Sequence, residues 1–153
     1  MIKHIKCDIF ESGADIICHQ VNCQGAMNSG VAKQVREKYP EVYRQYRRWC
    51  EDMNFSKALL GKMQFVNVPD GKMIINLFAQ HKYGYDGNCY TDYEALEKTL
   101  TIVDAMAHKA IIAIPYLMGC HRGGGDWNIV YAMIEKIFKD SENDVLICEY
   151  NGG

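Results

Sequence analysis

The chain has 153 residues, of which 48% are hydrophobic and 24% charged, and its formal net charge is −2. We expect a single domain over residues 1–153, because this length is sufficient for one buried core and no linker-like or low-complexity stretch divides the sequence. The small negative net charge argues against nucleic-acid binding that is mainly electrostatic.

The N-terminal region shows no charged leader followed by an apolar run, and no window approaches the ~20 apolar residues of a membrane span. We therefore expect a cytoplasmic protein without a membrane partner. Seven cysteines, an odd number without a C-x-x-C pair, favour buried reduced thiols. For Cys23 and Cys120, which lie among glycines, a nucleophile or a metal ligand is the alternative.

Hydrophobic periodicity predicts alternating strands and helices. Pro40 is expected to open the second helix, Thr91 to cap the third, and the Asp70-Gly71 pair to form the turn of a hairpin. We expect strands at 2–7, 15–18, 60–68, 73–78, 111–114 and 145–150, and helices at 30–38, 40–53, 91–108 and 127–138.

Two of the expected strands, 111–114 and 145–148, are apolar at consecutive positions, which is typical of strands buried on both faces. The layer order is therefore helix, sheet, helix. Because a hairpin interrupts the strand–helix units, we predict an α/β fold, a three-layer α-β-α sandwich with a mixed central sheet.

The first glycine loop, residues 19–32, reads HQVNCQGAMNSGVA and joins an apolar strand to a helix. Glycine permits positive φ angles and close backbone approach to a ligand, and a helix N-terminus offers unpaired N–H groups to an anion. The alternative is that Gly25 and Gly30 only turn the chain. The loop matches neither the dinucleotide nor the nucleoside-triphosphate glycine pattern.

The second glycine loop, residues 117–127, reads LMGCHRGGGDW and also follows an apolar strand. Three consecutive glycines are entropically costly, so they are expected where the backbone lies against another group or turns sharply. Ligands of open α/β sheets bind beyond the carboxyl ends of the strands. Two such loops side by side therefore predict a site for the two phosphates of a diphosphate.

With Asp8-Ile9 at the end of the first strand, these two loops resemble those of the macrodomain family, small α/β modules that bind ADP-ribose. The resemblance covers the whole chain. The segments HQVNCQG and LLGKMQFVNVPDGKMIINLFAQ are most similar to the branch that contains ADP-ribose 1″-phosphate phosphatases and terminal or nucleic-acid ADP-ribosyl hydrolases.

The resemblance implies a role for each matching position. Asp8 and Ile9 would contact adenine, with Tyr150 and Asn151 beside adenine and its ribose, although Tyr150 is equally compatible with plain packing. The first loop would contact the distal ribose, and the second would surround the diphosphate. The implied ligand-binding residues of the two loops are Asn22, Gln24, Gly25, Ser29, Gly30, Val31, Leu117, Met118, Gly119, Cys120, His121, Arg122, Gly123 and Gly124.

Some hydrolases of this branch use a lysine after the strand equivalent to 74–78. Here Gln80 stands nearest that position, and Lys82 serves only if the register shifts by two residues, about 7 Å along a strand. The phosphatase-like interpretation uses His19 as general acid or base, Asn28 at the reacting end, and Asp126 to orient water. The alternatives are a hydrogen-bonded core residue for His19 and an N-cap for Asp126.

The sequence thus leaves two functions. The first is hydrolysis of a substituent from the distal ribose of ADP-ribose, acting on ADP-ribose 1″-phosphate or on ADP-ribosylated protein or nucleic acid. The second is an ADP-ribose recognition module without turnover. The polar groups at the distal end favour the enzyme, and the missing lysine favours the module. Neither function requires a metal or another cofactor.

Overall fold

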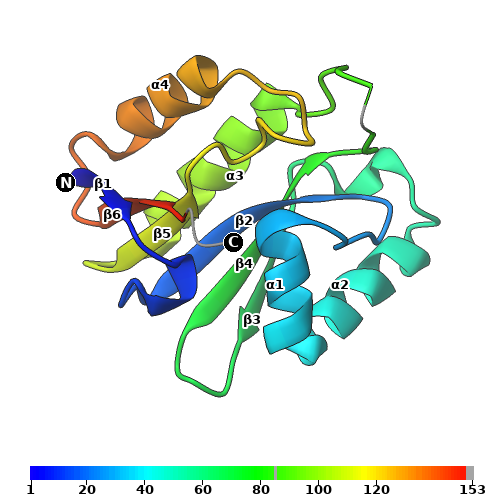
Figure 1. Cartoon of the computed structure of the whole chain (residues 1–153), viewed down its shortest axis with the longest axis horizontal. Helices are drawn as coiled ribbons and strands as arrows, with labels where there is room; N and C mark the ends of the chain where they lie inside the picture. The colour runs from blue at the N-terminus through cyan, green and yellow to red at the C-terminus, as the bar shows by residue number, and fades with distance from the viewer. Residues whose placement is uncertain (85, 151–153) are drawn as a thin grey trace.

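The computed structural model describes residues 1–84 and 86–150, and it consists of a six-stranded sheet with helices on both faces (Figure 1). Within these residues, no helix combines the length and the apolar character needed to span a membrane. The strands are β1 (Ile2–Lys6), β2 (Ile16–Asn22), β3 (Met63–Asn67), β4 (Met73–Gln80), β5 (Ile111–Pro115) and β6 (Asp144–Glu149). The helices are α1 (Gly30–Lys38), α2 (Pro40–Asp52), α3 (Tyr93–Met106) and α4 (Trp127–Phe138), with short 3-10 turns η1 (Ile9–Glu11) and η2 (Lys57–Leu59).

The sheet is mixed, with strand order β1-β6-β5-β2-β4-β3. All neighbouring pairs are parallel except β3 and β4, which form the predicted hairpin. Gly71 in its turn has φ +90°, and the amide of Val68 donates to the carbonyl of Lys72. The Asp-Gly turn signal is therefore confirmed.

Each face of the sheet is covered by a pair of helices, α1 and α2 on one side and α3 and α4 on the other (Figure 1). Val35 and Tyr46 pack on the first face together with Ile17 and Ile74 of the sheet. The second face buries a separate apolar cluster from α3, α4 and alternate strand positions. The predicted three-layer α-β-α sandwich is confirmed.

Strand β2 is longer than the sequence indicates, because it continues through residues 19–22, of which His19, Gln20 and Asn22 are polar. It lies between two parallel neighbours, and its pairing with β4 extends to Asn22 opposite Gln80. The polar side chains of this segment predict a loop. Backbone hydrogen bonds to a neighbouring strand nevertheless extend β2 through it. The first glycine loop consequently begins its irregular part at Cys23.

The third helix is capped by Asp92, whose Oδ1 accepts from the amide of Ala95, so the prediction of Thr91 as the cap is wrong by one residue. Thr91 instead donates its hydroxyl hydrogen to the carbonyl of Gly119. The local pattern predicts that the Thr91 hydroxyl caps the helix, but in the fold this hydroxyl bonds to the distant residue Gly119 instead.

Candidate functional site

A cavity of about 470 Å³ opens at the carboxyl ends of β2 and β5. These strands are neighbours, and the chain leaves them in opposite directions, through α1 and α2 to the β3–β4 hairpin and through α4 to β6. This is a topological switch point, where the two glycine loops come to lie side by side. The cavity is lined by His19, Gln20, Val21, Asn22, Ala26, Asn28, Ser29, Gly30, Val31, Ala32, Gln80, Tyr83, Pro115, Tyr116, Leu117, Met118, Gly119, His121, Arg122, Gly123 and Tyr150.

The side chain of Asn22 shapes the first glycine loop from within. Its Oδ1 accepts from the amides of Gln24 and Ala26 and from the hydroxyl of Tyr46, and its Nδ2 donates to the carbonyl of Ala26. Asn22 is buried. It therefore stabilises the turn that leads to α1, and its side-chain hydrogen bonds are made to other groups of the protein.

The N-terminus of α1 faces the cavity, since Ser29, Gly30 and Val31 all line it. Ser29 is the N-cap but makes no side-chain cap hydrogen bond, and the first turn carries no acidic residue. First-turn amides have no partner within a helix, and the helix dipole makes this end partly positive. This part of the cavity therefore suits an anion or an electron-rich oxygen.

Asn28 lies at the same end of the cavity and is held from outside. Its Oδ1 accepts from the guanidinium of Arg36 at 3.1 Å, and that guanidinium lies 4.1 Å from the ring centroid of Tyr43. Both Asn28 and Arg36 are exposed. The pairing orients the carboxamide of Asn28 at the cavity rim and adds a positive charge there.

The second glycine loop forms the opposite wall. Leu117 at its start has φ +63°, a conformation that non-glycine residues rarely adopt, and Gly119 has φ +77°. Strained backbone of this kind clusters at ligand sites. His121 and Arg122 are the basic residues of this wall. The described residues that line the cavity include no aspartate or glutamate. The electrostatics thus favour an anionic ligand.

The three consecutive glycines are explained by contact between loops. A Cβ at Gly124 would lie 2.1 Å from the carbonyl oxygen of Asn88, and one at Gly123 would lie 2.5 Å from Oγ1 of Thr91. One at Gly125 would lie 2.7 Å from the carbonyl oxygen of Gly119. Glycine is required here because the second loop packs backbone to backbone against residues 88–91 and against itself.

A chain of hydrogen bonds, the Gln20 network (Gln20, Gln80, Thr91 and Gly119), joins this loop to the sheet. Nε2 of Gln20 donates to Oε1 of Gln80 at 2.8 Å and to Oγ1 of Thr91 at 2.9 Å. Thr91 donates to the carbonyl of Gly119 at 2.6 Å. Nε2 of Gln80 donates to the carbonyl of Lys82 at 2.8 Å. The network connects the ends of β2 and β4 to the second glycine loop.

His19 lies on β2 below the first glycine loop and is only 2% exposed. Its Nε2 is 2.6 Å from Oδ1 of Asn76. Burial lowers the pKa of His19 to about 4, against a smaller raising effect of the hydrogen bond to Asn76. The ring is therefore neutral at physiological pH.

No family model matches the chain. The DNA ADP-ribosyl glycohydrolase of Mycobacterium tuberculosis is 28% identical over 158 residues, covering the whole chain and 43% of the relative. The ADP-ribose 1″-phosphate phosphatase of Aspergillus oryzae is 37% identical over 71 residues, covering 45% of the chain and 35% of the relative. The chain thus spans less than half the length of these curated relatives.

Solved structures extend the similarity to the full fold. A Bacteroides thetaiotaomicron protein of unknown function superposes with a TM-score of 0.84 and 28% identity, over 97% of this chain and 98% of its own. A macrodomain protein from Streptomyces coelicolor superposes with a TM-score of 0.78 and 25% identity, over the whole of both chains. The chain has the macrodomain fold.

The cavity brings together residues predicted from both glycine loops and from the last strand. The predicted residues that line it are His19, Asn22, Asn28, Ser29, Gly30, Val31, Leu117, Met118, Gly119, His121, Arg122, Gly123 and Tyr150. The predicted residues outside its lining are Asp8, Ile9, Gln24, Gly25, Cys120, Gly124 and Asp126. Asn151 lies outside the described residues.

Most residues outside the lining have a structural task. Nε2 of Gln24 donates to the carbonyls of Phe55 and His81, and a Cβ at Gly25 would meet the side chain of Arg47. Oδ1 of Asp126 accepts from the amide of Asn128. Asp126 is thus the N-cap of α4, which is the alternative interpretation that the sequence offers for it. Gly124 faces residues 88 and 89 rather than the cavity.

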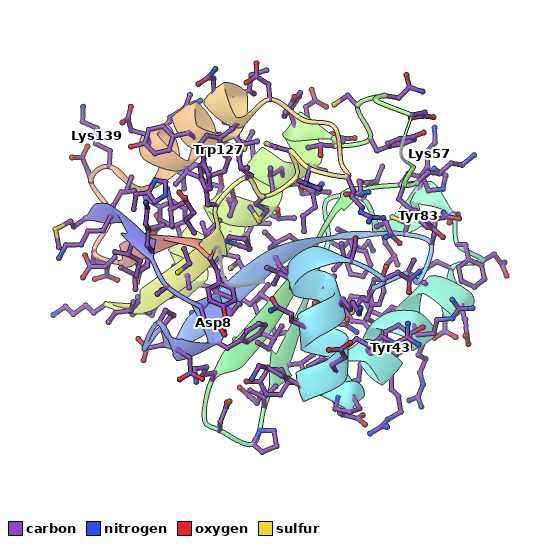
Figure 2. All side chains as sticks on the ribbon, viewed as in Figure 1. Asp8, Tyr43, Lys57, Tyr83, Trp127 and Lys139 are labelled. Carbon is purple, nitrogen blue, oxygen red and sulfur yellow. The ribbon has the colours of Figure 1, made fainter. Side chains whose placement is uncertain are left out.

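Asp8 and Ile9 lie at the end of β1, beside the cavity rather than in its wall. Oδ1 of Asp8 accepts from the amide of Phe10 and so caps η1, while Ile9 is buried in the core. Cys7 pairs through its amide with the carbonyl of Glu149, the residue before Tyr150. Figure 2 shows Asp8 well separated from Tyr83. A ligand contacting both would be elongated.

Sequence reasoning missed several lining residues: Gln20, Val21, Ala26, Ala32, Gln80, Tyr83, Pro115 and Tyr116. Gln80 was considered only as a replacement for lysine. Tyr83 lines the cavity, whereas Tyr93 begins α3 and its hydroxyl accepts from the amide of Asp126. Tyr85 lies outside the described residues. The sequence signal that could have identified Gln20 and Gln80 is their position near the ends of two predicted strands, which are adjacent in the sheet.

Reactive groups other than His19 are scarce at the site. Lys82 is exposed and does not line the cavity, and the described lining residues include no lysine. Burial raises the pKa of Cys23 to about 12 and that of Cys120 to about 11. Their thiols are thus protonated and weakly nucleophilic at neutral pH. Residues 1–84 and 86–150 contain no group of three His, Cys, Asp or Glu side chains suited to a metal ion.

Proposed function

We propose that this macrodomain binds ADP-ribose in the cavity and hydrolyses a substituent from its distal ribose. The observation that carries the proposal is the switch-point cavity, which has a helix N-terminus on one side, two basic residues on the other, and no carboxylate among its described lining residues. Such a site favours a diphosphate over a cation or a neutral ligand.

The family pattern suggests how ADP-ribose would lie. Adenine would approach Tyr150 and Asp8, the diphosphate would contact the backbone of residues 119–123, and the distal ribose would reach Asn28. The mycobacterial and fungal relatives are named for removing ADP-ribosyl groups from DNA and phosphate from ADP-ribose 1″-phosphate. We propose the same two substrate classes here, with ADP-ribosylated protein as a third.

His19 and Asn28 are the proposed groups at the reacting end. Because His19 is neutral and buried, it would act by accepting a hydrogen bond or proton rather than by donating one from an imidazolium. Asp126 is not included, because its carboxylate caps α4. The second candidate is a recognition module that binds ADP-ribose without turnover, and the absence of a lysine from the described lining favours it.

The deciding experiment measures release of phosphate and formation of ADP-ribose from ADP-ribose 1″-phosphate, in the presence of a chelator, beside ADP-ribosylated DNA and ADP-ribosylated protein. His19→Gln is compared with His108→Gln, because His108 is an exposed histidine that pairs with Glu142 far along the chain. We expect turnover of one substrate, lost in His19→Gln and retained in His108→Gln. ADP-ribose binding without turnover of any substrate would establish the recognition module.

A further inference from the structure

Three polar side chains cross the face of the sheet beneath α1 and α2. The His19 row (His19, Asn76 and Gln64) comes from β2, β4 and β3, with His19 paired in register to Asn76 and Asn76 to Gln64. All three are buried, at 2%, 0% and 2% exposure. The flanking positions on the same face, among them Ile17 and Ile74, are apolar.

The hydrogen bonds along the row have a direction. Nδ2 of Asn76 donates to Oε1 of Gln64 at 2.9 Å, which leaves Oδ1 of Asn76 toward His19. A carboxamide oxygen only accepts, so Nε2 of His19 at 2.6 Å carries the hydrogen. In a neutral imidazole the other nitrogen then has a free lone pair. Nδ1 of His19 is thus an acceptor.

That acceptor has no partner within residues 1–84 and 86–150. Nδ1 of His19 is buried and makes no hydrogen bond to these residues, although His19 lines the cavity. The fully or nearly fully buried titratable groups of the apolar cluster on the same face are Cys23, Tyr46, Cys50 and Cys148, and burial raises the pKa of each, so they stay neutral. A buried polar atom without a partner is costly and rare, and it requires an explanation.

We propose that Asn76 and Gln64 are positioning residues that hold His19 in its Nε2–H tautomer, so that Nδ1 accepts a hydrogen bond from a hydroxyl group bound in the cavity. The donor is either a hydroxyl of the distal ribose or a water molecule beside it. This inference rests on the proposed function, since it gives His19 its orientation there. In many catalytic sites the base is oriented by a third group, and Asn76 would have that role toward His19.

A purely structural role makes a different prediction. Buried polar networks can also serve to specify strand register, and then the tautomer of His19 and any contact with a ligand are irrelevant. The two roles are separated by observing the ring nitrogens directly.

The first test is ¹⁵N NMR of the full chain labelled at histidine, with His19→Gln used to assign the signal among the five histidines. We expect the Nε2–H tautomer in the free protein and a shift confined to Nδ1 when ADP-ribose saturates the cavity. An Nδ1–H tautomer would overturn the proposal. This measurement does not depend on turnover, so it remains decisive even if the protein is a recognition module.

The second test compares Asn76→Asp with Asn76→Leu in binding and turnover. A carboxylate near Nε2 keeps the tautomer and stabilises the imidazolium, so Asn76→Asp should retain turnover and move the acidic limb of its pH profile upward. Asn76→Leu should lower kcat roughly 10- to 100-fold. Thr99→Val is the matched control, because Thr99 is a fully buried polar residue that bonds within α3.

The same variants identify the hydroxyl donor. If Nδ1 contacts a ribose hydroxyl, Asn76→Leu weakens ADP-ribose binding by about 10-fold. If Nδ1 contacts water, the Kd is unchanged and kcat alone falls. An unchanged Kd, an unchanged kcat and an Nδ1 signal insensitive to bound ADP-ribose would together reject the proposal, while thermal unfolding verifies that each variant is folded.

Discussion

The hydroxyl of Thr91 donates to the carbonyl oxygen of Gly119 at 2.6 Å while accepting from Nε2 of Gln20 at 2.9 Å. Thr91 follows the loop after β4, Gly119 lies in the second glycine loop, and Gln20 belongs to β2. One hydroxyl thus connects three segments that surround the cavity. Because Gly119 lines the cavity, the position of its backbone depends on Thr91.

Thr91→Val should therefore weaken ADP-ribose binding about 5- to 10-fold, corresponding to about 1 kcal/mol for a lost hydrogen bond. Thr91→Ser keeps the hydroxyl and should bind as the wild type does. Thr101→Val removes a hydroxyl that bonds within α3 and serves as the control. Calorimetry on the four proteins tests this, and equal affinities for the valine and serine variants at position 91 would contradict it.

Gly124→Ala should destabilise the fold far more than Gly87→Ala. Both glycines have positive φ, +67° and +79°. A Cβ at Gly124 would lie 2.1 Å from the carbonyl oxygen of Asn88, whereas one at Gly87 meets no atom of the described residues within 4 Å. Gly87→Ala should cost about 1–2 kcal/mol from the backbone conformation alone.

Gly124→Ala adds a backbone clash, so we expect a loss of at least ~3 kcal/mol in the free energy of unfolding by urea. ADP-ribose affinity should fall in the same variant, because the second glycine loop must move. Similar unfolding free energies for the two alanine variants would show that the loops do not pack as described.

The stability of the protein should depend on pH through His19. Its pKa in the fold is about 4, below its ordinary value of 6.5. Between these values the unfolded chain binds a proton that the folded chain excludes, so the free energy of unfolding falls as the pH is lowered from about 6.5 to 4. The loss from this group is on the order of 3 kcal/mol.

Chemical denaturation at pH 7, 5.5 and 4.5 measures this dependence. His19→Gln should flatten the pH profile over that interval, because glutamine does not titrate. The same slope in wild type and His19→Gln would assign the acid sensitivity to other groups.

Asp8→Ala should weaken ADP-ribose binding by about 1–3 kcal/mol, the value of a hydrogen bond to a charged group, if its carboxylate accepts from adenine. The substitution also removes the cap of η1. Asp8→Asn keeps an oxygen for the amide of Phe10, so it separates the two effects: stability should return while part of the affinity stays lost. Full affinity in Asp8→Ala would refute the adenine contact.

Local sequence determined much of the architecture, because helices and turns depend on residues within a few positions of each other. The predicted helix at 30–38 is observed with those bounds, Pro40 opens α2, and the Asp70-Gly71 turn closes the hairpin. Consecutive apolar residues in β5 and β6 correctly predicted burial on both faces, and hence three layers. The two glycine loops were likewise recognisable from their composition.

Tertiary structure alone decided which side chains meet. His19 bonds to Asn76, 57 residues away, and Gln20 to Thr91, 71 residues away. Such pairs depend on the register of neighbouring strands and on how loops pack, and neither is encoded within one stretch of sequence. For this reason the sequence indicated where a ligand would bind, whereas the fold decided that Asp126 caps a helix and that His19 is buried and neutral.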